Sequence, residues 1–174
     1  MKPQLQNISI GKLTGVFGLK GELVLRHALG NTGLEGLEKI LIKDKAGSLI
    51  PWFVTTTRVK NDEEVYLKLE DISTPEAAKP LLQKEVWLSE DDFKKYANRT
   101  APISLLGYTV KDDKQVLGKI LEVIEQPHQV LCRLLVHGKE VYIPLHEESL
   151  KKVDHKYKNI TVRLPEGLLD IYLG

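Results

Sequence analysis

The chain has 174 residues, of which 42% are hydrophobic and 28% are charged, values that are typical of a globular protein with a packed core. They exclude a disordered or collagen-like chain and leave room for one or two small domains. Because 25 basic and 24 acidic residues give a net charge of +1, a protein that holds nucleic acid mainly through phosphate contacts is disfavoured.

The first half of the sequence is a series of short segments with β-strand patterns. Each segment alternates apolar and polar residues or is rich in β-branched and aromatic residues, and turn-forming residues separate the segments. Many short strands at this spacing are typical of a small barrel. We predict strands at residues 7–13, 22–27, 39–43, 50–59, 65–70 and 84–90.

Four glycines, Gly11, Gly15, Gly18 and Gly21, are clustered between the first two predicted strands. Their spacing does not fit the phosphate-binding G-x-x-x-x-G-K-[ST] loop, and a strand follows where a dinucleotide-binding fold needs a long helix. GVFG and GLKG match the G-x-x-G of RNA-clamping loops, but that motif works between helices. We interpret the glycines as turn and close-approach points of a hairpin, with the RNA clamp as the weaker alternative.

The next signals predict a short helix and a linker. In ISTPEAAKPLLQK, Ser73 is the expected N-cap and Glu76 completes a capping box. Pro75 suits the first turn of this helix, and Pro80 keeps the helix short or broken. The polar stretch at residues 91–102 lacks a strand period and ends in proline, which is typical of a linker. We therefore predict a first domain over residues 1–92, a linker over 93–102 and a second domain over 103–174.

The second half is again rich in strand patterns. Residues 105–110 and 116–126 predict a hairpin and a long strand, and VLCRLLV and VYIP predict another hairpin with His137 and Gly138 at its turn. LHEESLKKVD is predicted to be a short helix or irregular, KNITVRL a last strand, and PEGLLDIYLG an apolar tail. The predicted fold class is mainly β: two small β-barrel domains joined by a short linker, with one or two short helices.

The sequence contains no strong catalytic or metal-binding motif. The five histidines show no H-x-x-x-H or H-x-H spacing, and the single cysteine, Cys132, can neither complete a zinc site nor form an internal disulfide. No G-x-S-x-G elbow occurs, although a Ser, His and Asp set assembled in three dimensions stays open. We predict no catalytic, cofactor-binding or metal-binding residues and expect Cys132 to be buried.

Four segments, in order, carry a family resemblance. GKLTGVFGLKGE matches a G-x-x-x-G-x-x-G-x-x-G-E signature, and EEVYLKLEDISTPEAAKPLLQKEVWL contains an Asp-Ile-Ser and Glu-Ala-Ala core. The third segment consists of LLGYTV and LGKILEV, and the fourth consists of YIPLHEESLKKVD and ITVRLPEGLLDIY. Together these segments resemble the RimM family of ribosome maturation factors across nearly the whole chain. The resemblance implies a first barrel like those of translation factors and a second, PRC-barrel domain.

The resemblance also implies a function. A protein of this family binds the free small (30S) ribosomal subunit, not the finished ribosome, and assists late assembly of the subunit head and 16S rRNA processing without catalysis. Its implied partners are ribosomal protein nineteen of the small subunit and 16S rRNA as part of the particle. We expect a cytoplasmic monomer with no cofactor and no membrane partner, since no secretion signal or membrane span is evident. The alternatives are a general RNA-binding module and an rRNA-processing enzyme with a composite site.

Two positions depart from the family pattern. The family's aromatic pair, which is linked to subunit binding, is replaced by Thr100 and Ala101, so that contact is lost or supplied by Tyr96 or Tyr108. The residue before Gly18 is often His in the family and is Phe17 here, which argues against acid–base chemistry at this point.

The proposed mode of action is docking of two rigid barrels, whose binding energy favours the native arrangement of the subunit head. No bond is broken in this mode. The predicted partner-binding residues are Lys20 and Arg26, which are expected to face rRNA, and Tyr108, Pro144, Leu145, Lys151 and Lys152, which are expected to line a protein contact.

Overall fold

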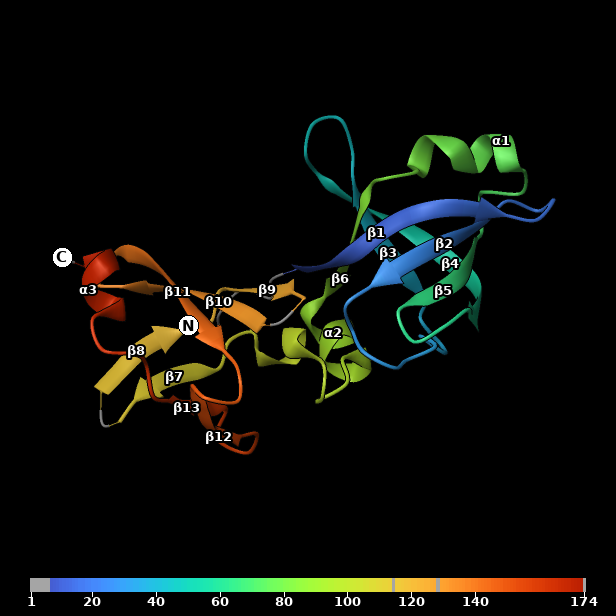
Figure 1. The fold of residues 1–174 in the computed structure, drawn as a ribbon. Coiled ribbons are helices and arrows are strands. Elements are labelled where there is room, and N and C mark those ends of the chain that lie inside the picture. Colours follow the sequence, from blue (N-terminus) through green and yellow to red (C-terminus); the bar gives the residue numbers. More distant parts are fainter. Residues whose placement is uncertain (1–6, 114, 128, 174) are drawn as a thin grey trace. The chain divides into compact units, whose positions relative to one another are not determined.

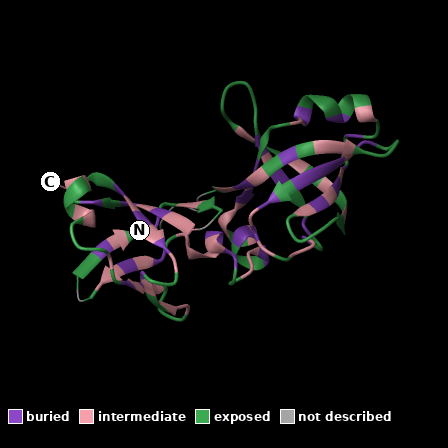
Figure 2. Cartoon of the chain, viewed as in Figure 1, coloured by how far each residue is buried: buried purple, intermediate pink, exposed green. Residues whose placement is uncertain are grey.

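The computed structural model describes residues 7–113, 115–127 and 129–173. The chain divides into two compact units, Met1–Ala101 and Pro102–Gly174. Strands dominate both units and the helices are short, so the predicted fold class of two β-rich domains with few short helices is confirmed (Figure 1). Buried and exposed residues alternate along many of the strands, which is the pattern on which the prediction was based (Figure 2).

The first unit is a barrel closed by six antiparallel strands in the order β1-β2-β5-β4-β3-β6. Each of the six strands expected from the sequence is present, and the first of them runs through Gly11 and Gly15 to Phe17. Fully buried leucines, such as Leu23 and Leu67, fill the interior. The strands are β1 (Asn7–Phe17), β2 (Glu22–His27), β3 (Lys39–Lys43), β4 (Leu49–Val59), β5 (Glu64–Leu69) and β6 (Glu85–Ser89).

Two of the clustered glycines stand where another backbone segment leaves no space for a side chain. A Cβ atom at Gly11 would lie 1.8 Å from the carbonyl oxygen of Arg26, and one at Gly21 would lie 2.3 Å from that of Thr74. Gly21 also has a φ of +74°, in the left-handed region that favours glycine. The register of β1 shifts next to Gly11, and such a bulge bends the strand. The prediction of close-approach points is confirmed at these two positions.

The predicted short helix of the first unit is present, with a different N-cap. α1 (Pro75–Ala78) continues into the 3-10 helix η1 (Lys79–Leu81), so the expectation of a short or broken helix is confirmed. The side-chain oxygen of Thr74 accepts a hydrogen bond from the backbone N–H of Ala77 at 3.2 Å, whereas Ser73 was the predicted N-cap. Proline favours the first helical position, so the N-cap is the residue directly before it.

Part of the predicted linker over residues 93–102 is helical. α2 (Glu90–Tyr96) begins after Ser89, whose side chain caps its first turn. Phe93 and Tyr96 are buried, so this helix packs as a part of the first unit. The polar composition suggested a linker, but acids in the first turn and lysines in the last turn are the charges that stabilise helix ends.

The second unit covers one core with two sheets, in the orders β11-β10-β9 and β12-β13-β7-β8. All neighbouring strands are antiparallel except β7 and β13, which pair in parallel. Cys132, Leu134 and Ile143 are fully buried in the core between these sheets. The elements are η2 (Pro102–Leu105), β7 (Thr109–Asp112), β8 (Gln115–Lys119), β9 (Glu122–Gln126), β10 (Gln129–Val136), β11 (Lys139–Leu145), β12 (Leu150–Asp154), β13 (Asn159–Val162) and α3 (Leu168–Leu173).

Three predictions for the second unit have clear outcomes. The hairpin turn is confirmed, since His137 and Gly138 both have positive φ angles, of 52° and 79°. LHEESLKKVD was expected to be helical or irregular, but its second half is β12, where a bulge next to Leu150 interrupts the alternation. The apolar tail contains α3, and its Leu169 and Tyr172 pack against the core.

Candidate functional site

A group of aromatic and charged side chains lies on the outer face of the first barrel. Leu23 of β2 and Leu67 of β5 are fully buried inside the barrel. Since successive side chains of a strand point to opposite faces, the neighbouring Val24 and Tyr66 point outward; Tyr66 is half-buried there, and Val24 is only 7% exposed. The register aligns Val24 with Tyr66 and Tyr66 with Arg58, so β2, β5 and β4 each contribute one residue to this outward row.

We call the outward-facing residues Phe17, Glu22, Val24, Arg58 and Tyr66 the Phe17 cluster. The ring centroids of Phe17 and Tyr66 are 4.7 Å apart. The Cζ atom of Arg58 lies 4.6 Å from the centroid of the Tyr66 ring and 5.7 Å from that of Phe17. Its Nη2 atom donates to Oε2 of Glu22 at 2.8 Å. These contacts hold the guanidinium over the rings and make the cluster an ordered platform.

The turn between β1 and β2, residues 18–21, adjoins this platform and is called the Leu19 turn. Leu19 is 91% exposed, and Phe17 at the end of β1 is 46% exposed. The backbone N–H of Gly21 donates to the carbonyl oxygen of Gly18 at 3.4 Å. The turn extends from the barrel beside α1 (Figure 1). A large apolar side chain is thus held in solvent by a defined backbone turn.

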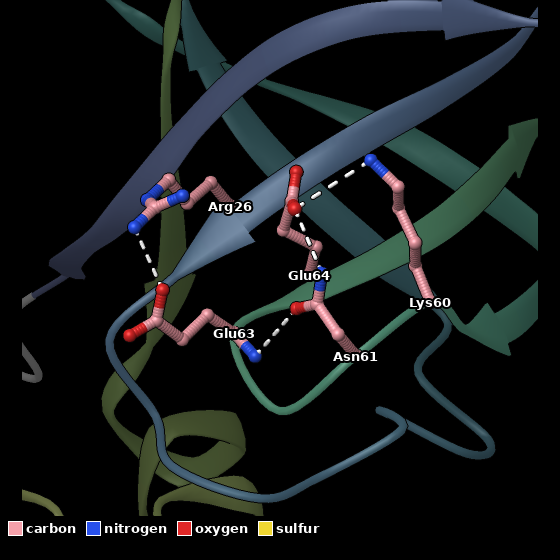
Figure 3. Close-up of polar contacts among 5 residues, drawn as sticks. All are labelled: Arg26, Lys60, Asn61, Glu63 and Glu64. Carbon is pink, nitrogen blue, oxygen red and sulfur yellow. Dashed lines mark hydrogen bonds and ion pairs between the residues drawn. The ribbon is translucent and has the colours of Figure 1, made fainter.

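The two cations predicted to face rRNA lie apart from each other. Lys20 is exposed in the Leu19 turn, before the start of β2. Arg26 lies near the other end of β2, where its Nη2 atom donates to Oε2 of Glu63 at 2.7 Å (Figure 3). The structure therefore does not bring these two cations into one basic patch.

Acidic residues balance the basic ones around Arg26. The Nζ atom of Lys60 lies 3.5 Å from Oε1 of Glu64 (Figure 3). Asn61 donates to the Glu64 carboxylate at 2.9 Å, and this hydrogen bond is the main cause that lowers the pKa of Glu64 below its ordinary value. Since both cations have carboxylate partners, this end of β2 offers little net positive charge to a phosphate.

Several residues predicted to contact a partner are buried. Tyr108 is 7% exposed, and its hydroxyl lies 2.9 Å from Nδ1 of His155. Leu145 faces the core of the second unit. Tyr96, which together with Tyr108 was a candidate replacement for the family's aromatic pair, donates its hydroxyl to the carbonyl oxygen of Glu35 at 2.8 Å. Burial argues against a direct partner contact by any of these three side chains.

The remaining predicted residues of the second unit are accessible. Pro144 is half-buried and points away from the core, because its neighbours Ile143 and Leu145 point inward. Lys151 and Lys152 are exposed on β12. These three residues stay candidates for a partner contact.

Burial shifts the pKa of two groups, one in each unit. Nδ1 of His27 accepts a hydrogen bond from the backbone N–H of Leu29 at 3.2 Å, while Nε2 has no hydrogen-bond partner among the described residues. Burial lowers the pKa of His27 below its ordinary value, and the nearby Glu63 partly opposes this shift. In the second unit, burial raises the pKa of the Cys132 thiol to about 12.

Within the described ranges, no three His, Cys, Asp or Glu side chains are grouped closely enough to hold a metal ion. Among the same residues, no helix has the length and apolar character needed to span a membrane.

Sequence reasoning missed the residues that form the most distinctive surface. Leu19, Arg58 and Tyr66 were not among the predicted contacts, and Phe17 was noted only as a departure from the family pattern. A leucine between two glycines of a predicted hairpin turn was the available signal for Leu19. Arg58 and Tyr66 come from different strands, so only the strand register shows that they meet Phe17.

The closed first barrel, the two-sheet second unit and the exposed apolar turn define a two-domain β protein with an ordered outer surface. Comparison with family models then gives a direct result for each unit. Residues 8–93 match the RimM N-terminal domain, and residues 102–168 match the RimM PRC barrel domain. The chain belongs to the RimM family.

Individual relatives agree with this assignment. The chain is 37% identical over 166 residues to the ribosome maturation factor RimM of Parabacteroides distasonis, a match that covers 93% of this chain and 95% of the relative. It is 30% identical over 165 residues to the ribosome maturation factor RimM of Amoebophilus asiaticus, covering 94% of each chain. Among solved structures, that of a putative 16S ribosomal RNA processing protein RimM from Pseudomonas aeruginosa is 17% identical with a TM-score of 0.45, covering 92% of this chain and 98% of that chain, and the assignment does not rest on it.

Proposed function

We propose that this protein is a ribosome maturation factor that binds the free small (30S) ribosomal subunit and assists late assembly of its head and 16S rRNA processing. The match of both RimM domain models, in order, over residues 8–93 and 102–168 is the observation that carries the proposal. Relatives that match over nearly their whole length are named ribosome maturation factors. The proposal places the protein in the cytoplasm, where small subunits are assembled.

In this proposal the protein acts by binding and not by catalysis. A surface that fits the native arrangement of an immature particle binds that arrangement more tightly and so shifts the population toward it. Support comes from the Phe17 cluster and the Leu19 turn, because ordered aromatic, arginine and apolar side chains are typical of strong protein contacts. The proposed partners are ribosomal protein nineteen of the small subunit and 16S rRNA within the particle.

Sedimentation of a bacterial lysate that contains the tagged protein tests the proposal. We expect the protein to migrate with free small subunits and to be absent from intact ribosomes. Equal association with intact ribosomes, or migration with neither particle, would contradict the proposed function. Overexpression of an unrelated tagged β protein of similar size controls for trapping in the gradient.

Two further measurements separate the proposal from its rivals. The purified protein, incubated with precursor 16S rRNA and magnesium, is expected to leave the RNA intact, whereas cleavage would favour an enzyme. Binding to small subunits is expected to weaken only gently with salt, since a general RNA-binding module would lose affinity steeply. Stronger binding to protein-free rRNA than to small subunits would favour the general module.

A further inference from the structure

A run of basic residues lies on β12 and on the turn that joins it to β13 (Figure 1). We call this turn, residues 155–158, the Tyr157 turn. Residues 151–158 contain one acidic residue, Asp154, and four exposed lysines, which are Lys151, Lys152, Lys156 and Lys158. None of these lysines forms an ion pair with any residue that the structure describes. They therefore differ from Arg26 and Lys60 of the first barrel, which both have carboxylate partners.

The Tyr157 turn has a defined backbone. Oδ1 of Asp154 accepts hydrogen bonds from the backbone N–H groups of Lys156 and Tyr157, each at 3.0 Å. The carboxylate is thus directed at the backbone of the turn itself. The carbonyl oxygen of Lys158 accepts a hydrogen bond from the backbone N–H of Thr109 at 2.9 Å, which ties the turn to β7. A side chain presented by such a preformed turn loses little conformational entropy of the backbone on binding.

The turn presents one aromatic ring to solvent. Tyr157 is 67% exposed, although the Nζ atom of Lys156 lies over its ring, 5.3 Å from the centroid. An exposed aromatic side chain alone is common in soluble proteins. An exposed ring among lysines, however, is the arrangement that binds unpaired nucleotides, because a base stacks on the ring while cations contact the phosphates.

The outer face of the adjoining sheet is also basic. Ile160 of β13 and Val110 of β7 are fully buried in the core. Since successive side chains of a strand point to opposite faces, the residues that follow them, Thr161 and Lys111, point outward. The register aligns Lys152 of β12 with Thr161, and Thr161 with Lys111. Lysines from β12 and β7 therefore lie on either side of a threonine on one outward row.

The composition of this face favours RNA over a protein partner. The centre of a protein-binding surface is enriched in aromatic residues, methionine and arginine and is depleted in lysine. Here threonine and asparagine side chains, Thr109, Asn159 and Thr161, lie on the strands between the lysines. Such side chains bind phosphate and sugar oxygens, and lysines without carboxylate partners can take the place of counterions at phosphates.

We propose that the Tyr157 turn and the outer face of β12, β13 and β7 bind an unpaired segment of 16S rRNA in the immature small subunit. The ring of Tyr157 stacks on one unpaired base. Lys152, Lys156 and Lys158 contact the phosphates that flank this base. This inference rests on the proposed function and deepens it, because it moves the rRNA contact from the first barrel to the second unit. It also gives Lys152, which was expected to line a protein contact, an RNA partner.

A photoreactive azidophenylalanine in place of Tyr157 identifies what the turn touches. After illumination with purified free small subunits, we expect a crosslinked product that ribonuclease digestion reduces nearly to the size of the free protein. A product that keeps its larger size after digestion would place a protein at the turn and would overturn the proposal. The same group at Leu135, which is 48% exposed on β10 in the other sheet, is the matched control. A yield at position 157 no higher than at position 135 would also overturn the proposal.

The salt dependence of binding to purified small subunits tests the phosphate contacts. Each lysine that contacts a phosphate contributes about 0.7 to 0.9 to the slope of the logarithm of the association constant against the logarithm of the salt concentration. Lys152→Gln is therefore expected to reduce this slope by nearly one. Lys45→Gln, at an exposed position in the turn between β3 and β4, is the control and should leave the slope unchanged. Equal slopes for the two variants would overturn the phosphate contact of Lys152.

The affinity of Tyr157→Ala for purified small subunits tests the stacking contact. Loss of one stacked base corresponds to a roughly 10-fold rise in Kd. Tyr157→Phe keeps the ring and is expected to bind like the wild type, and thermal unfolding of both variants checks that they fold. Equal binding of Tyr157→Ala and the wild type would overturn the inference but leave the proposed function intact. Failure of the wild type to bind small subunits would instead overturn the proposed function and this inference with it.

Discussion

The first unit encloses its core with one sheet of six strands, whereas the second covers its core with two sheets of three and four strands. A single sheet that closes on itself must bend strongly, and at Gly11 the backbones of β1 and β2 come too close to leave space for a Cβ atom. Two separate sheets need less bending, and the core of the second unit depends more on how its side chains fit. The two units are therefore expected to be sensitive to different kinds of substitution.

The largest effect is expected for Gly11→Ala in the first unit. The new Cβ atom would lie 1.8 Å from the backbone oxygen of Arg26, and a backbone atom in a closed sheet cannot move aside easily. We expect a loss of more than about 4 kcal/mol in the free energy of unfolding, measured by urea denaturation of the purified protein. Gly15→Ala is the control, because its nearest neighbouring atom is 3.8 Å away. If the two variants were equally stable, the close approach of the backbones at Gly11 would not limit the stability of the first unit.

The second unit should respond most to truncation of a core side chain. Leu134 is fully buried, so Leu134→Ala is expected to lower the free energy of unfolding by about 3 kcal/mol. Leu135→Ala is the matched control on the opposite face of β10, where the side chain is 48% exposed and the change should be within about 0.5 kcal/mol. If Leu134→Ala were as stable as Leu135→Ala, side-chain fit would not decide the stability of this unit.

A smaller effect in the same core is expected from Cys132→Ser. The substitution keeps the size of the side chain but buries a hydroxyl group among apolar neighbours, at a cost of about 2 kcal/mol. Cys132→Ala removes the sulfur atom without adding a polar group and should cost less. Chemical denaturation of both variants gives their free energies of unfolding. A serine variant as stable as the alanine variant would contradict the prediction.

The pH dependence of the first unit should show the smallest effect. Because burial places the folded-state pKa of His27 below its ordinary value of 6.5, the unfolded chain takes up the proton first as the pH falls. The stability that neutral His27 contributes is present above about pH 6.5 and is lost as the pH decreases further. Urea denaturation between about pH 7 and about pH 5 should show a weaker decline for His27→Gln than for the wild type. An unchanged decline would show that His27 does not cause it.

Much of the fold followed from local patterns, and the exceptions have physical reasons. Period-two alternation located the strands of the first barrel, and the His137–Gly138 pair located a hairpin turn because both residues adopt positive φ angles. Helix α2 was missed because charged residues cover most of its surface, although Phe93 and Tyr96 pack inward. β12 was missed because a bulge interrupts its alternation.

The candidate site was less accessible to sequence reasoning than the fold. Lys20, which was predicted to face rRNA, lies exposed in the Leu19 turn, but no residue pattern specifies the 91% exposure of Leu19 beside it. Arg58 and Tyr66 join Phe17 only through the pairing of β4, β5 and β2. Tyr108 was predicted to be a contact but is buried directly before β7, with its hydroxyl against His155. Local sequence patterns do not show this pairing, because the two residues are far apart in the sequence.

The parallel pairing of β7 with β13 has a consequence for how the chain folds as it is synthesised. β13 stands between β12 and β7, so β12 has no neighbouring strand in its sheet until residues 159–162 leave the ribosome. The first barrel, by contrast, can close once β6 has emerged, since β1 and β6 pair directly. For much of translation, a finished amino-terminal barrel therefore precedes a carboxy-terminal half whose sheet edges are still open.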